Sequence, residues 1–236
     1  MRRGLFASLQ RIYARLPETT CDNCARCCFE SPGLFFVEHL SLLAHLRQQS
    51  RRRREELVRR ALHELFFAWV DPQRQCIFLE SSRCTLYERR PLACRLFGLV
   101  APTEREQAEM EARLAAQEEA QRYARLGVVI PVEVAQRALV SCDRVRDKHG
   151  QPVRVDADAL AAEVARLDEA LLSREVVLHE FCFRSLPDRL GAALFGAETV
   201  EPMRLQLLRR AQQGEEIGDL SRQVWELVKD RSPKVV

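Results

Sequence analysis

Four cysteines lie within the eight-residue stretch Cys21-Asp22-Asn23-Cys24-Ala25-Arg26-Cys27-Cys28. Three more follow at wider spacing, at Cys76, Cys84 and Cys94. Seven of the nine cysteines therefore form two clusters in the N-terminal part of the chain. In a reducing compartment, clustered thiols serve as metal ligands more often than as disulfides. We therefore predict a site for a metal ion or an iron–sulfur cluster.

The spacing of the first cluster is suited to metal binding. A Cys-x-x-Cys step places two sulfurs on one side of a tight turn, and Cys21, Cys24 and Cys27 repeat this step twice. The spacing occurs in zinc proteins and in iron–sulfur proteins. Since neighbouring residues point in different directions, we expect Cys27 and Cys28 not to bind one metal in the same way. One zinc ion or one four-iron cluster uses four thiolates, so seven thiols indicate two centres, or one centre with spare thiols.

The other cysteines and the histidines add little to this site. Cys142 and Cys182 are isolated in the sequence, and we expect them to be buried as small hydrophobic residues. His179 lies close to Cys182 and is the one histidine that could join a site. A packed or solvent-facing histidine is the more frequent case, so its participation stays open.

The composition is that of a globular chain with no strong electrostatic field. The chain has 236 residues, of which 47% are hydrophobic and 30% charged, and the net charge is +3. We therefore expect no nucleic-acid binding. We also expect no membrane span, because no run of about 18 apolar residues occurs. The residues after Met1 lack the apolar core of a signal peptide, which favours a cytoplasmic location. The four arginines at 51–54 are expected to form a solvated junction between helices.

The pattern of apolar residues predicts a mainly α fold. An irregular cysteine-rich metal-binding core with little β structure is expected to precede a helical C-terminal half. We divide the chain into a cysteine-cluster domain over 1–100, with N-terminal helices, and a helical region over 101–236, which can pack together as one globule. A short strand is expected at 76–79, a turn at 81–83, a helical turn from Pro91 carrying Cys94, and a linker over 143–156. The helices are predicted over 5–16, 34–49, 55–70, 103–126, 131–140 and 156–172, after Pro187 with a break near Gly196, and over the segment that contains Leu220 and Val228.

Three motifs together resemble a known bacterial family. They are Cys21-x-x-Cys24-x-x-Cys27-Cys28, Cys76-x-Phe-Leu79, and Cys84-Thr-Leu-Tyr87-Glu-Arg-Arg90-Pro91-x-x-Cys94-Arg95-x-Phe97. The combination is similar to the CxxCxxCC (YkgJ-type) family, whose cysteines are associated with zinc or iron chelation. The flagellin lysine-N-methylases carry a similar cluster. The resemblance covers residues 21–98.

The resemblance and the spacing lead us to expect an iron–sulfur protein. The cofactor would be a [4Fe–4S] cluster that supports redox chemistry or the modification of a protein substrate or partner. Tyr87, Arg90 and Arg95 are expected to surround the site, where they would fix the loop and balance the negative charge of the thiolates. The pool of candidate ligands is Cys21, Cys24, Cys27, Cys28, Cys76, Cys84 and Cys94.

Two alternatives from other functional classes remain open. The first is a structural zinc module in which the metal holds an irregular core and the helical half binds a protein partner. The second is an enzyme similar to the protein lysine methyltransferases, although the chain shows no glycine-rich nucleotide-binding loop. The sequence therefore leaves open whether the protein is an enzyme.

Overall fold

The computed structural model describes residues 2–20, 24–99, 102–136, 142, 144–171 and 184–231. Over these ranges the chain is mainly α, as predicted, and its strands form only short antiparallel pairs. Those pairs are β1 (Thr19–Thr20) with β5 (Arg146–Asp147), β2 (Gly33–Leu34) with β6 (Arg184–Ser185), and β3 (Leu79–Glu80) with β4 (Arg83–Cys84). The helices are α1 (Arg2–Tyr13), α2 (Phe36–Leu46), α3 (Arg51–Phe67), α4 (Leu92–Leu96), α5 (Pro102–Arg125), α6 (Val132–Ala135), α7 (Ala157–Glu169), α9 (Leu186–Phe195), α10 (Ala197–Gln212) and α11 (Ile217–Val228), with 3-10 turns η1 (Arg26–Cys28) and η2 (Tyr87–Arg89).

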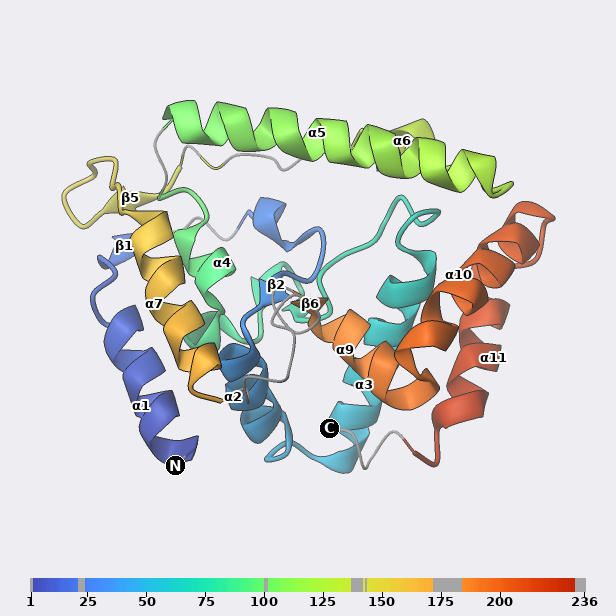
Figure 1. Ribbon diagram of the computed structural model, residues 1–236, viewed down its shortest axis with the longest axis horizontal. Helices are drawn as coiled ribbons and strands as arrows, with labels where there is room; N and C mark the ends of the chain where they lie inside the picture. Colours follow the sequence, from blue (N-terminus) through green and yellow to red (C-terminus); the bar gives the residue numbers. More distant parts are fainter. Residues whose placement is uncertain are drawn as a thin grey trace.

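Two groups of helices make up the body of the molecule (Figure 1). At one end, α1 and α7 pack beside α2 around apolar side chains such as Leu9, Val37 and Val164. At the other end, α3 packs against α9, α10 and α11 around a core that includes Phe66 and Leu190. The second core draws on segments from both halves of the chain. The boundary proposed near residue 100 stays a prediction.

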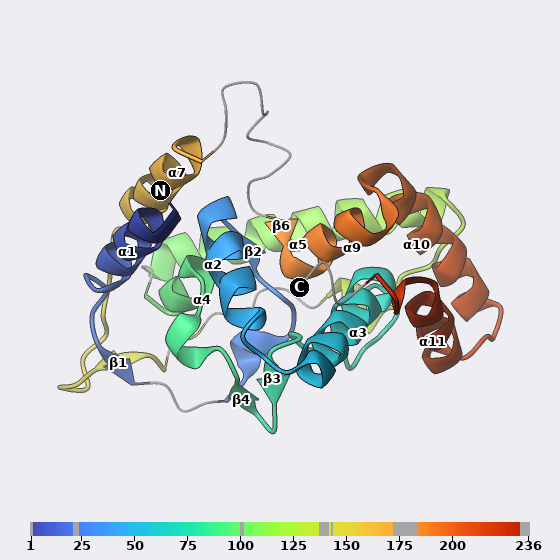
Figure 2. The same ribbon diagram turned by 90° about the horizontal axis from the view of Figure 1, so that it is seen from below.

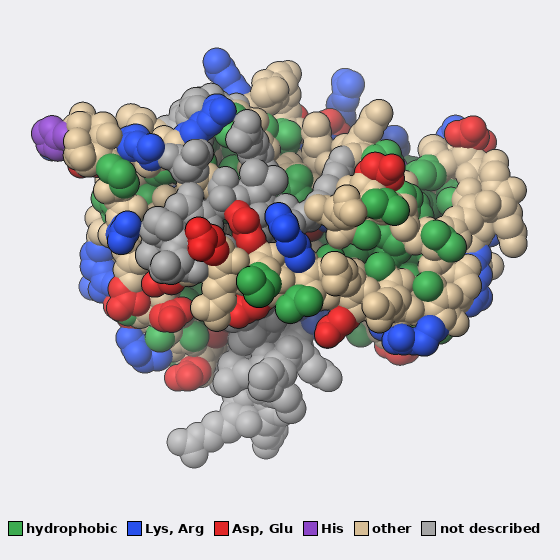
Figure 3. All heavy atoms as spheres, turned by 90° about the horizontal axis from the view of Figure 1, so that it is seen from above, with side chains coloured by type: hydrophobic (Ala, Val, Ile, Leu, Met, Phe, Trp, Pro, Cys, Tyr) green, Lys and Arg blue, Asp and Glu red, His purple; other side chains and the backbone are tan. Residues whose placement is uncertain are grey.

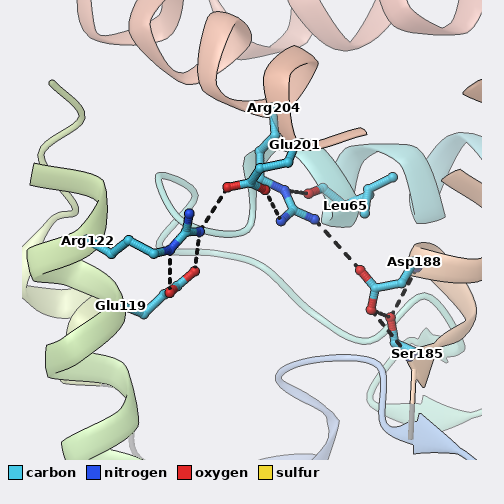
Figure 4. Close-up of polar contacts among 7 residues, drawn as sticks. All are labelled: Leu65, Glu119, Arg122, Ser185, Asp188, Glu201 and Arg204. Atoms are coloured by element: carbon cyan, nitrogen blue, oxygen red, sulfur yellow. Dashed lines mark hydrogen bonds and ion pairs between the residues drawn. The ribbon is translucent and has the colours of Figure 1, made fainter. Parts of the chain in front are cut away.

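Helix α5 lies across both groups and is largely exposed (Figure 1). Arg122 of α5 pairs with its own neighbour Glu119 and with Glu201 of α10, at 2.6 and 2.8 Å. Arg204 extends this network from α10, because it contacts Glu201 and Asp188 of α9 (Figure 4). Ion pairs therefore connect α5 to α10 and α9.

The surface of the molecule on the side where α5 lies is partly apolar. Hydrophobic side chains reach the surface on this side of the molecule (Figure 3). Met110 and Leu114 of α5 are 65% and 54% exposed. Val129, which precedes α6, and Val132, its first residue, are 70% and 61% exposed. Among the described helices, none is both long enough and apolar enough to cross a membrane.

Local signals in the sequence correctly mark several helix ends. Asp156 accepts a hydrogen bond from the Ala159 N–H at 2.9 Å and begins α7, as predicted. Gly196, with φ of 89°, separates α9 from α10 at the expected break. The helix expected over 131–140 is observed as α6 over Val132–Ala135, and residues 137–140 lie outside the described ranges.

Two expectations about the second cysteine segment and the arginine run are wrong. Residues 77 and 78 form a turn closed by a hydrogen bond from the Leu79 N–H to the Cys76 carbonyl, so the strand begins only at Leu79. The four arginines at 51–54 form the first turn of α3 and are not a junction, because the Ser50 side chain caps that helix. Arg53 pairs with Glu80 of β3. Figure 2 shows the β3–β4 hairpin beside α3.

The linker expected over 143–156 is also only partly correct. Arg146 and Asp147 form β5 and pair with Thr20 and Thr19 of β1. The Val155 N–H donates to the Leu99 carbonyl at 3.0 Å. Backbone hydrogen bonds thus connect this segment to two earlier parts of the chain.

Candidate metal centre

Five cysteine side chains line one cavity of about 60 Å³. Two of them come from η1 in the first cluster, and three come from the later segments that contain β3, β4 and α4. Most of the surface around them is apolar, with Leu34, Leu42 and Phe78 among the lining residues. The cysteines are Cys27, Cys28, Cys76, Cys84 and Cys94.

The first cluster enters the cavity through a 3-10 turn. Ala25 precedes the turn with φ of 59°, and its carbonyl accepts the Cys28 N–H at 2.9 Å. The tight turn places the Sγ atoms of Cys27 and Cys28 only 3.8 Å apart. Our expectation that Cys27 and Cys28 do not bind one metal in the same way stays a prediction, but their two sulfurs lie close together. Two thiolates bound to one tetrahedral ion at about 2.3 Å would lie about 3.8 Å apart, so the pair can face one metal.

Backbone contacts fix the second segment against the first. The Cys76 N–H donates to the Cys28 carbonyl at 2.8 Å. Arg60 of α3 donates to the carbonyls of Cys76 and Leu79, at 3.2 and 2.7 Å. Leu79 is paired with Cys84 across the β3–β4 hairpin. Cys76 and Cys84, which are separated by a turn, are thus brought to the same cavity.

The last of these thiols, Cys94, is held by the N-terminal end of α4. The Leu92 N–H, in the first turn of that helix, donates to Glu38 Oε1 at 2.6 Å. Glu38 lies on α2, is only 5% exposed, and also accepts from the Phe35 N–H and from the Tyr13 hydroxyl. One buried carboxylate therefore connects α1, α2 and the helix that carries Cys94.

The five thiols differ in their acidity. A hydrogen bond with Cys28 lowers the pKa of Cys27 to about 6, and the cation of Arg90 acts in the same direction. The same hydrogen bond and burial raise the pKa of Cys28. Burial raises the pKa of Cys76 to about 12 and also raises the pKa of Cys84 and of Cys94. When the Cys27–Cys28 pair loses its first proton, the resulting thiolate is therefore mainly on Cys27.

This difference predicts selective alkylation of metal-free protein. Because its pKa is lowered, the Cys27 thiol ionises more readily at pH 7 than Cys76, whose pKa is raised by burial and which remains protonated. Iodoacetamide should therefore modify Cys27 before Cys76, as read by mass spectrometry of the peptides. Cys28→Ala removes the hydrogen-bond donor, and we expect it to slow the reaction at Cys27. Faster labelling of Cys76, or a rate at Cys27 that rises only near pH 8.5, would contradict this assignment.

Two of the three residues expected around the site line the cavity. Tyr87 and Arg90 are both part of its wall, and the Arg90 guanidinium lies 3.8 Å from the centre of the Tyr87 ring. Arg95 instead donates to the carbonyls of Arg90 and Glu88, both at 2.6 Å, and lies over the Tyr13 ring. Arg95 therefore fixes the loop, whereas Arg90 is the cation that acts on the thiols.

Five other candidate residues are not among these wall residues. Cys24 is exposed, and Cys142 is half-buried beside Gly98. Cys21, Cys182 and His179 lie outside the described residues. Within the described ranges, no three His, Cys, Asp or Glu side chains are placed to hold a single metal ion together. The ligand assignments stay predictions.

Several polar residues that shape the site were not predicted from the sequence. Besides Arg60 and Glu38, these include Ser31 and Glu64, which are 7% and 8% exposed. Glu64 directly precedes Leu65, Phe66 and Phe67 in α3. The other buried residues of this helix are apolar. An acidic residue inside such an apolar run is a signal that could have identified it.

Comparison with known proteins agrees with the cysteine pattern. Residues 20–122 match the CxxCxxCC family. Its description is "Putative zinc- or iron-chelating domain". The CxxCxxCC match includes every clustered cysteine and stops within α5, so it does not extend to α7, α9, α10 or α11. No curated protein and no solved structure matches the chain. The CxxCxxCC match is consistent with a cysteine site that chelates zinc or iron.

Proposed function

We propose that the protein binds an iron–sulfur cluster in the cavity lined by the five thiols. The observation that carries this proposal is the arrangement of the thiols. Five sulfurs share one mostly apolar cavity, which is enough for the four thiolates of a four-iron cluster with one thiol to spare. The thiols come from several separate turns of the chain, which suits a group that is held by thiolates on different sides.

The residues present fit such a group. Cys27, Cys76, Cys84 and Cys94 supply four thiolates from separate positions around the cavity, and Cys28 is the additional thiol. Arg90 is placed to offset part of the negative charge, because it already lowers the pKa of Cys27. A bound cluster would supply one-electron redox chemistry. Cys76 is buried and the other four thiols are half-buried, and burial of the sulfurs influences the reduction potential of a cluster.

A structural zinc site is the second candidate, and one distance favours it. The Sγ atoms of Cys27 and Cys28 are 3.8 Å apart, as expected for two thiolates on one tetrahedral zinc ion. In this case the metal would fix the irregular cysteine core, and the helical half would bind a partner. The methyltransferase hypothesis and the cytoplasmic location stay predictions from the sequence, and the described contacts add nothing to either.

Metal analysis of protein purified without oxygen tests the two candidates. We expect brown protein that contains iron and acid-labile sulfide, with broad visible absorption that bleaches on reduction. Colourless protein with one zinc ion per chain would contradict the cluster and support the structural site. Protein that binds neither metal after reconstitution would contradict both.

A further inference from the structure

A buried glutamate lies next to the thiol cavity without being one of the predicted ligands. Glu64 is on α3, one residue before Leu65, and is only 8% exposed. A carboxylate in such a place is costly unless its oxygens accept hydrogen bonds. Its partners therefore indicate why it is there.

Both oxygens of Glu64 are used by a single residue. Oε1 accepts the Ser31 N–H at 2.6 Å, and Oε2 accepts the Ser31 hydroxyl at 2.7 Å. This two-point contact fixes the backbone and the side chain of Ser31 together. Ser31 also lines the thiol cavity, so the contact connects α3 to the cavity wall.

Ser31 in turn contacts the cysteine turn that begins at residue 76. Its Oγ lies 3.9 Å from Cys76 Sγ, and the Ile77 N–H points to the same oxygen at 3.5 Å. The Cys76 N–H is bound to the Cys28 carbonyl. The orientation of Cys76 thus depends on Cys28 and Ser31. Glu64 holds Ser31 in place.

Hydrogen bonds also fix the part of helix α3 that carries Glu64. Arg204 of α10 donates from Nε to the Leu65 carbonyl at 2.8 Å (Figure 4). One turn earlier in the same helix, Arg60 binds the Cys76 carbonyl. Glu64 therefore projects from a helix that is fixed on both sides of it.

The ionisation of Glu64 is compatible with this contact. Burial raises its pKa to about 7, and the nearby Glu30 acts in the same direction, whereas the Ser31 hydrogen bonds and Arg74 lower it. Above neutral pH the carboxylate can accept both hydrogen bonds from Ser31. Experiments on the contact are therefore best made at about pH 8.

We infer that Glu64 is a positioning residue for the metal centre: acting through Ser31, it holds the Cys76 sulfur in the cavity in the orientation that metal binding requires. The inference rests on the proposed thiolate metal site, whichever metal that site holds. Residues that orient ligands in this way influence metal affinity and the spectroscopic properties of the centre.

Titration of metal-free protein with cobalt(II) at about pH 8 tests this role, because thiolate–cobalt absorption reports the ligand geometry directly. We expect Ser31→Ala to weaken cobalt binding about 10-fold or more and to shift the thiolate-to-cobalt band. Ser31→Thr keeps the hydroxyl and should restore the wild-type spectrum. Glu64→Gln should resemble Ser31→Ala, because the amide cannot accept both hydrogen bonds.

Asp168 provides a matched control for a purely structural effect. It is a second buried carboxylate that accepts two hydrogen bonds, from the N–H groups of Phe36 and Val37 at 2.6 and 2.7 Å, and it contacts α2 and not the cysteine turn. Asp168→Asn should lower the melting temperature but leave the cobalt spectrum unchanged. Wild-type affinity and spectrum in both Ser31→Ala and Glu64→Gln would overturn the inference. Wild-type protein without thiolate–cobalt absorption would instead overturn the proposed function.

Discussion

Replacing Cys84 with serine is expected to remove most of the bound metal and to lower the free energy of unfolding. Cys84 lies in β4 and lines the cavity together with the four other thiols. A serine hydroxyl is a poor substitute for a thiolate that binds zinc or iron. A metal present at 1,000 times its dissociation constant contributes about 4 kcal/mol to stability, and the variant should lose most of this amount. Metal content and chemical denaturation of the same preparation measure both effects.

Cys142→Ser is the control for this experiment. Cys142 is half-buried and contacts the region of Gly98, and it is not among the residues that line the cavity. Its substitution should leave metal content and the visible spectrum unchanged. Wild-type metal content in Cys84→Ser, or equal losses in both variants, would show that the cavity does not hold the metal.

Replacing Glu38 with alanine is expected to destabilise the protein by about 3–5 kcal/mol, even without metal. The substitution leaves three buried donors without their acceptor: the Tyr13 hydroxyl and the N–H groups of Phe35 and Leu92. Each donor left unsatisfied costs about 1–3 kcal/mol, less what water recovers. Because Leu92 begins the helix that carries Cys94, metal affinity should fall as well. Urea denaturation of metal-free protein measures the first effect.

Glu163→Ala is the control for Glu38→Ala. It tests whether losing any contact with the α1 region destabilises the protein to the same extent. Glu163 of α7 pairs with Arg15, which follows α1, at 2.7 Å on the surface. An exposed ion pair contributes little to stability, so the urea midpoint of this variant should stay close to that of the wild type. A similar small change in both variants would mean that water replaces Glu38 as the acceptor.

Features that depend on near neighbours in the chain could be predicted from the sequence. Helical periodicity located α1, α3, α5, α9 and α11, and the capping residue Asp156 marked the start of α7. The two cysteine clusters and the family match follow from residue identity and spacing. Residue order alone is therefore enough to infer the mainly α fold and to predict a cysteine cluster of the kind that chelates zinc or iron.

Relations between distant segments depend instead on how the chain packs. The hydrogen bonds from Cys76 to Cys28 and from Leu92 to Glu38 join residues that are 48 and 54 positions apart. No pattern within a single segment encodes such contacts. They decide which five thiols share a cavity, and they leave Cys24 exposed although it belongs to the same motif as Cys27.

The direction of individual side chains also depends on local geometry that spacing does not reveal. The 3-10 turn brings the sulfurs of Cys27 and Cys28 together, against the rule that neighbouring residues diverge. Glu64 faces the site because burial of the apolar side chains on α3 turns it inward, where Ser31 supplies its hydrogen bonds. Spacing thus determines the kind of chemistry, and packing around the buried carboxylates determines the geometry in which it occurs.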